Sequence, residues 1–231
     1  DARGDDVNQK AVVIKEALRD QNFQIVGEYQ PFKDAYIIAI TDDELIKSAG
    51  QSACGPFGVA QRVALTKVKN NIQVSYANPT YLAYAYRMKN NLGGIAKKLE
   101  TALGKGQDFG SQRGKTDKQL NKYHYTFGME YCTNVHNLAE YKSYGTAIDE
   151  LEKGLAAKKG GVSKVYRIDL PDGGGSIFGV GMTEGYSSDK LIFSKIDYVS
   201  QYKHTAHLPY EIWVQDNGKI VALHTRFRVA I

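Results

Sequence analysis

The chain has 231 residues, of which 42% are apolar and 24% charged, and this composition predicts a globular protein with a packed core. It excludes a disordered tail and a collagen-like rod. It also excludes a miniprotein held together by disulfides, since only 2 cysteines are present. No apolar run reaches the roughly 20 residues of a membrane-spanning helix, so we expect no membrane span. Tyrosine is over-represented, with 16 residues against 8 phenylalanines and 1 tryptophan.

The net charge of +5 comes from the segment between Arg87 and Lys122, which contains nine basic residues and three acidic ones. Such a segment can bind nucleic acid, anionic lipid or an acidic partner. Binding of single-stranded nucleic acid would also need aromatic side chains among the basic ones, and from Lys89 to Lys122 only Phe109 is aromatic. We therefore predict a solvated helix face followed by a loop, and no nucleic-acid partner.

The first half of the chain predicts a helix, two strands, a short helix and a hairpin. Helical spacing of apolar residues, acidic residues after an N-cap at Thr41, and alternation around Asn70-Asn71 indicate these elements. An Asn78-Pro79 pair then begins a long helix, which Gly93-Gly94 can bend or divide. The predicted ranges are 7–19, 23–29, 35–40, 42–46, 61–68, 72–76 and 79–103.

The second half repeats this order after a polar, Gly-rich loop at residues 104–115. A helix opens near Thr146 and Asp149, and it ends at Gly160-Gly161. The predicted ranges that follow are 162–170, 176–182, 188–192, 208–214 and 219–227. The same element order at an offset of about 146 residues predicts an internal repeat.

These elements predict an α+β protein of two related α/β-sandwich halves with mostly antiparallel sheets. We place the first repeat, with its long C-terminal helix, at residues 1–103. A Gly-rich basic linker follows at 104–122, and the second repeat occupies 123–231. Because the second copy ends where a counterpart of the helix at Pro79 would begin, we expect the natural chain to be able to continue past Ile231.

Residues 63–82, Val-Ala-Leu-Thr-Lys-Val-Lys-Asn-Asn-Ile-Gln-Val-Ser-Tyr-Ala-Asn-Pro-Thr-Tyr-Leu, resemble the bacterial and archaeal family called domain of unknown function 302. In that family a hairpin ends in a Val-Ser-Tyr-x-x-Pro-like signature that leads into a helix. Residues 207–219 resemble the same hairpin, but after Val221 the chain departs from the signature and no Asn-Pro follows. The resemblance implies a compact α+β domain with a mostly antiparallel sheet that often self-associates. It implies no catalytic residues, because the family has no established activity.

Two clusters contain the residue types of a copper or other transition-metal site. His124, Met129, Cys132 and His136 lie within 13 residues. However, alternating aromatic residues predict a strand over 123–133, which would turn Met129 away from His124 and Cys132.

His204 and His207 form the second cluster, which we expect to lie in a loop before Leu208-Pro209. The candidate metal ligands are therefore His204, His207, His124 and Cys132. The alternative is a tyrosine-lined core strand, together with loop histidines that bind backbone groups. Covalent haem is excluded, because no Cys-x-x-Cys-His motif occurs.

Enzyme motifs are largely missing from the sequence. The glycines near Lys115 and between residues 173 and 185 lack the spacing of a P-loop or a dinucleotide fingerprint. No Gly-x-Ser-x-Gly elbow and no His-Glu-x-x-His motif occurs, and nothing places a base beside Cys54. Enzymatic activity is thus uncertain, and the sequence argues against it more than for it.

The chain begins at Asp1 without an initiator methionine, which predicts a removed export signal and a periplasmic or extracellular location. There Cys54 and Cys132 could form a disulfide, and buried free thiols are the alternative. We expect a non-catalytic binding or self-assembly module that acts through its sheet and its tyrosines. The alternative is a small periplasmic metal- or redox-handling protein with a His/Met/Cys site.

Overall fold

The computed structural model describes residues 6–110 and 113–231, so parts of the predicted first repeat (1–5) and linker (111–112) lie outside the described residues. The first half contains α1 (Val7–Asp20), β1 (Gln24–Phe32), β2 (Ala35–Thr41), α2 (Asp43–Ala49), the 3₁₀ turn η1 (Gly55–Gly58), β3 (Gln61–Val68), β4 (Asn71–Tyr76), α3 (Pro79–Ala85) and α4 (Gly93–Leu103). The connecting segment holds α5 (Asp117–Leu120) and β5 (Val135–Glu140). The second half contains α6 (Tyr144–Ala156), η2 (Lys159–Gly161), β6 (Val162–Asp169), β7 (Ser176–Met182), α7 (Asp189–Ile196), η3 (Thr205–His207), β8 (Tyr210–Val214), β9 (Lys219–Leu223) and α8 (Thr225–Ala230).

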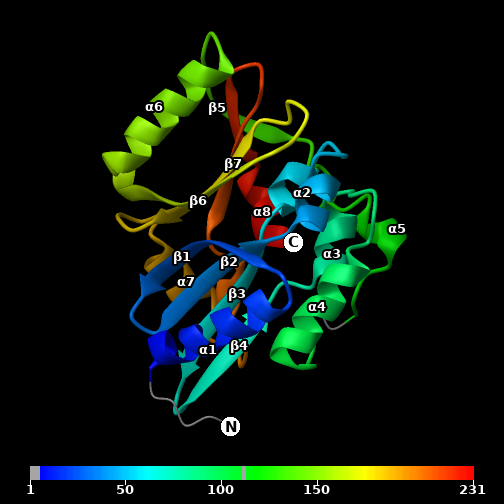
Figure 1. The fold of residues 1–231 in the computed structure, drawn as a ribbon, viewed down its shortest axis with the longest axis vertical. Coiled ribbons are helices and arrows are strands. Elements are labelled where there is room, and N and C mark those ends of the chain that lie inside the picture. Colours follow the sequence, from blue (N-terminus) through cyan, green and yellow to red (C-terminus); the bar gives the residue numbers. More distant parts are fainter. Residues whose placement is uncertain (1–5, 111–112) are drawn as a thin grey trace.

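Within the described residues the strands form two antiparallel sheets, ordered β1-β2-β3-β4 and β5-β9-β8-β7-β6 (Figure 1). This arrangement confirms the predicted α+β class with two related halves and mostly antiparallel sheets. None of the helices in the described ranges combines the length and the apolarity that a bilayer crossing requires.

The helix α1 shows how the local sequence sets an element. Asp6 is its N-cap, and the side chain accepts a hydrogen bond from the backbone N–H of Asn8. Ala11, Ile14 and Leu18 recur at helical spacing and are buried in the main core. Burial of this stripe against β2 and β3 fixes the helix on one face of the first sheet.

The two halves share strand register as well as element order. Both first strands carry a β-bulge at the equivalent point, at Val26 in β1 and Val165 in β6. Following the register from these bulges across the sheets places Arg62 of β3 and Glu211 of β8 at equivalent positions. The internal repeat therefore extends to individual residue pairs.

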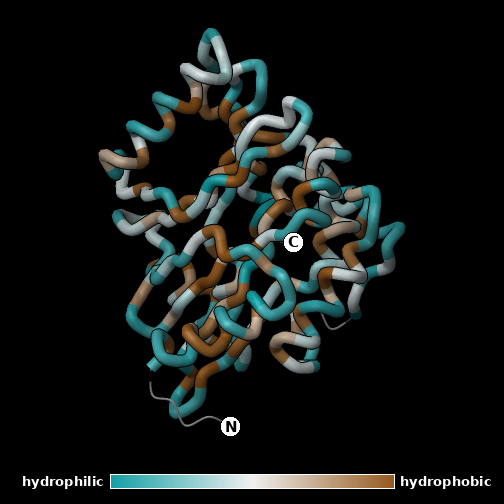
Figure 2. Tube along the Cα trace, in the orientation of Figure 1, coloured by the Kyte–Doolittle hydropathy of each residue, from teal (hydrophilic) through white to brown (hydrophobic). Residues whose placement is uncertain are grey.

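Each sheet is covered on one face by its own half and on the other by the opposite half. The first sheet packs α1 on one face, while Phe193 of α7 and Leu208 after η3 pack on the other. The second sheet packs α6 on one face, and on the other Phe57 of η1 meets Trp213 edge-on, with ring centroids 6.0 Å apart. Apolar segments accordingly gather between the layers and polar segments lie in the outer loops (Figure 2).

The predicted long helix after Pro79 is divided. The helix α3 ends at Ala85 and α4 begins at Gly93, after a break in which Leu92 has a left-handed backbone with φ of 51°. The side chain of Asn90 accepts a hydrogen bond from Leu92 N–H and stabilises this break. The helix predicted over 79–103 is thus divided, as the sequence allowed, but the break lies before Gly93-Gly94 and not at this pair.

Two predictions for the second half were wrong. Residues 123–133 form no strand but an irregular segment, because Tyr123 and Cys132 are anchored to separate parts of the core. The closing strand β9 ends at Leu223, and α8 then starts after an N-cap at His224. The counterpart of α3 is therefore present before Ile231, contrary to our expectation.

Candidate functional site

His204 lies directly before η3 and is held by Asp197, the C-cap residue that follows α7. The carboxylate of Asp197 accepts hydrogen bonds from the backbone N–H of His204 and from its ring, with 2.8 Å between Nδ1 and Oδ1. Since an ionised carboxylate can only accept, this contact places a proton on Nδ1 and leaves Nε2 to face other partners. His204 also borders an open surface pocket beside Phe109 and Tyr202.

His207, at the end of η3, lies beside a buried charge cluster that joins the two halves. Arg62 of β3 and Arg228 of α8 both bind Glu211 of β8, the latter with 3.2 Å between Nε and Oε2. The three charged side chains are at most 5% exposed. The guanidinium groups also donate to the carbonyls of Ala206 and His207, which disperses the excess positive charge.

The cluster affects the protonation of His207. Burial lowers the pKa of His207, and the positive charges of Arg228 and Arg62 lower this pKa further. The imidazole is therefore neutral near pH 7. His204 is close enough to add a smaller electrostatic contribution in the same direction.

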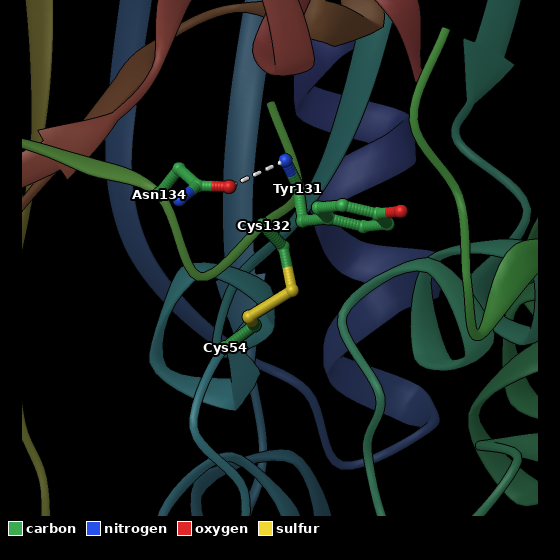
Figure 3. The surroundings of a disulfide bond; sticks show 4 residues. All are labelled: Cys54, Tyr131, Cys132 and Asn134. Carbon is green, nitrogen blue, oxygen red and sulfur yellow. Dashed lines mark hydrogen bonds between the residues drawn. A yellow bond between two sulfur atoms is a disulfide. The ribbon is translucent and has the colours of Figure 1, made fainter. Parts of the chain in front are cut away.

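Cys132 forms a disulfide with Cys54, with 6.0 Å between the Cα atoms (Figure 3). Both cysteines are buried, and the bond joins the turn before η1 to the segment that enters β5. The disulfide is the alternative that the structure supports over free thiols. The prediction that Cys132 is a metal ligand is therefore corrected, because its sulfur is bonded to the sulfur of Cys54 and is not a thiolate.

The segment before Cys132 projects from the molecule as an aromatic loop, which we define as residues 124–131. Met129 N–H donates to the carbonyl of Thr126, and this closes a turn that exposes Phe127. At the base, Tyr131 exchanges two hydrogen bonds with Asn134, one of which is drawn in Figure 3. The loop is thus fixed at its base and exposed at its tip.

His124 lies at the start of this loop and packs against it. Its ring lies 4.7 Å from the ring of Tyr131, and its Nδ1 is 2.6 Å from the carbonyl oxygen of Thr126. His136, the last member of the predicted quartet, is instead on β5, where its ring stacks on His224 at 4.1 Å. The four residues predicted from their close spacing in the sequence, His124, Met129, Cys132 and His136, therefore do not form one site in the structure.

The structure does not bring the four predicted ligands together. His204 and His207 lie near one another at η3, while His124 and Cys132 lie at either end of the aromatic loop. Across residues 6–110 and 113–231, no three His, Cys, Asp or Glu side chains form a group that could hold a metal ion.

Asp197, Phe109 and Glu211 are the site residues that sequence reasoning missed. Glu211 carried a usable signal, since it is a single charge between apolar neighbours in a predicted strand. Phe109 was visible only as the one aromatic residue of the basic segment. Asp197 had no signal, because its contact with His204 depends on the turn between them.

Comparisons of the chain with protein-family models, with curated proteins and with solved structures give no match. The resemblance to domain of unknown function 302 therefore stays a prediction, and function must be argued from the geometry.

Proposed function

We propose that the protein is a non-catalytic binding module of an oxidising compartment, and that it contacts its partner through the aromatic loop. The observation that carries this proposal is the exposure of Phe127, whose side chain is 98% accessible at the tip of the loop. Tyr125 is 68% exposed beside it. Aromatic side chains of this kind are the residues that contribute most to binding when a partner covers them.

The anchoring of the loop reduces the entropy that binding would cost. Tyr123 precedes the loop and donates from its hydroxyl to the carbonyl of Ala230 at 2.6 Å. Cys132 follows it and is fixed by the disulfide. A loop held at both ends loses less conformational freedom on association than a free one.

The surroundings of the loop favour a protein partner that offers an apolar pocket with an acidic rim. The guanidinium of Arg87 lies 5.6 Å from the ring centre of Tyr131, and the ammonium of Lys115 lies 5.2 Å from that of Tyr123. Tyr131 is 38% exposed and Tyr123 is buried, so these contacts place positive charge at the base of the loop, where it increases the rate of association with acidic surfaces. The partner with this chemistry is a second copy of the chain or a different protein, and the experiment below distinguishes the two.

The disulfide supports the proposed periplasmic or extracellular location, because such bonds persist in oxidising compartments and are rare in reducing ones. We expect protein taken from its native source to have an intact mass about 2 Da below that of its reduced form, since forming one disulfide removes two hydrogens. Equal masses before and after reduction would contradict an oxidising compartment.

The alternative of a metal- or redox-handling protein finds no comparable geometry in the described residues. Cys132 is bonded to Cys54, and His124 interacts with groups of its own loop.

The experiment replaces Phe127 and uses other exposed aromatic residues as controls. If the partner is a second copy of the chain, Phe127→Ser is expected to abolish the concentration-dependent association in sedimentation velocity. If the partner is a different protein, the same change is expected to abolish the partner cross-links formed in the native source. Tyr186→Ser and Tyr198→Ser change side chains that are 95% and 84% exposed on other loops, and they should alter neither result. If Phe127→Ser behaves like wild type in both measurements, the aromatic loop is not the contact element.

A further inference from the structure

A second feature, separate from the aromatic loop, is the pocket beside His204. It has a volume of about 570 Å³ and lies between residues 108–110 and residues 200–204. Its aromatic wall is formed by Phe109 and Tyr202, whose ring centroids are 5.0 Å apart. The ring of His204 completes this wall, with its centroid 5.3 Å from that of Phe109.

Hydrogen bonds hold the 197–204 loop in place. Lys203 Nζ donates to the carbonyls of Asp197 and Ser200 at 2.8 and 2.9 Å. The side-chain amide of Gln73 on β4 bonds to both the N–H and the carbonyl of Lys203. This side of the pocket is therefore formed before any ligand arrives.

The opposite side is linked to the same loop. The hydroxyl of Tyr202 donates to Oε1 of Gln107 at 3.0 Å, which positions Phe109 two residues further along. The two loops thus meet through this hydrogen bond and through the contacts of Phe109 with the rings of Tyr202 and His204.

The charge of the lining differs from that of the whole chain. Among the described residues, Asp108 lines the pocket and no lysine or arginine does, although the chain has a net charge of +5. Aromatic faces carry partial negative charge and attract cations within about 6 Å of the ring centre. The lining therefore combines an acidic residue with two aromatic rings, and both kinds of group favour positive charge.

We propose that this pocket binds an organic ammonium cation, with Phe109 and Tyr202 contacting the cation or an attached ring and Asp108 supplying the opposite charge. The ammonium group can belong to a free amine or to a lysine side chain of a peptide, since both present the same chemistry. No role in this binding falls to the aromatic loop.

The test measures the affinity of the intact protein for three probes of similar size by NMR titration. We expect 2-phenylethylammonium to bind and to shift the ring resonances of His204, while phenylacetate and benzyl alcohol bind more weakly. Asp108→Asn and Phe109→Leu should each reduce the affinity for the cation about twofold to fivefold, as expected for an exposed ion pair and a cation–π contact.

Asp117→Asn is the matched control, because it removes an exposed carboxylate from α5 outside the pocket. It should leave the affinity unchanged, and the thermal unfolding of all variants should match wild type. Equal binding of the three probes, or undiminished binding by Asp108→Asn, would overturn the proposal. Binding of a lysine-containing peptide but not of 2-phenylethylammonium would assign the ammonium to a peptide instead of a free amine.

Discussion

At the scale of single residues, the most consequential feature is that Arg62 and Glu211 occupy equivalent positions in the two halves and bind each other. Identical halves would place two arginines or two glutamates in contact at this point. The difference between the two copies therefore replaces a like-charge contact with an ion pair. Arg228 adds a second positive charge, so Glu211 forms ion pairs with two buried guanidinium groups.

The substitution Glu211→Gln should lower the free energy of unfolding by about 3–5 kcal/mol, because it leaves two buried cations without a counter-charge. Glu152→Gln is the control, since Glu152 pairs with Lys164 at the surface, and it should cost less than about 1 kcal/mol. Urea unfolding of the two variants provides the comparison. Similar losses in both would show that the buried cluster contributes no more than a surface pair.

His207 gives the stability a defined pH dependence. Its pKa in the folded protein lies below its value of about 6.5 in the unfolded chain, so the unfolded state binds more protons as the pH falls. His207 should therefore reduce stability as the pH drops below about 6.5, and the reduction should be complete only below the folded pKa.

Replacing His207 by glutamine should remove about 1 kcal/mol of the stability change between about pH 7.5 and 5.5. His124→Gln, in the aromatic loop, serves as the control. An unchanged pH profile in His207→Gln would contradict the effect of burial on this group.

At the scale of elements, contact between the two halves depends on a glycine. Gly27 follows the bulge of β1, and a Cβ atom placed there would overlap the carbonyl oxygen of Val165 in the bulge of β6. Gly154, in contrast, lies in α6 with open space around it. The structure therefore requires glycine at position 27, where a side chain would clash, but not at position 154, where a side chain has room.

Gly27→Ala should destabilise the protein by about 1–3 kcal/mol, because neither backbone can move without shifting the strand contact. Gly154→Ala should stabilise it by about 0.5–1 kcal/mol, since alanine restricts the unfolded chain and favours the helix. Thermal unfolding of both variants measures the difference. A stabilising effect at Gly27 would mean that β1 and β6 do not pack as closely as described.

Local patterns were sufficient to predict many elements but not the connections between them. The strand at 176–182 and the helix starting at Val7 follow from periodicity and capping, which operate within a few residues. The aromatic loop resembled a strand because its tyrosines alternate, yet the disulfide and the Tyr123 contact decide its path. His204 was recognisable as a candidate residue, whereas Phe109 meets it only through the tertiary fold.

At the scale of the whole molecule, each half covers one face of the other half's sheet. Phe193 of the second half is buried against the first sheet, and Phe57 of the first half is buried against Trp213 of the second. Separating the halves would expose both apolar faces to water. The two sheets should therefore gain and lose their structure together.

We accordingly expect one cooperative unfolding transition, in which Trp213 fluorescence and far-UV circular dichroism give the same midpoint in urea. Tyr186→Ser, at an exposed surface position, should leave this coincidence intact. Two separated transitions, or a fragment of residues 123–231 that folds alone, would show that the halves are independent.

The Cys54–Cys132 bond also determines how tension would pass through the chain. The two cysteines are 78 positions apart, so the bond shortens the extensible length by about 270 Å at roughly 3.5 Å per residue. A force applied to the two termini would run through the disulfide and bypass everything between the cysteines. The aromatic loop and Phe109 both lie within this bypassed ring, so stretching the molecule would place no tension along the backbone of either until the bond is reduced.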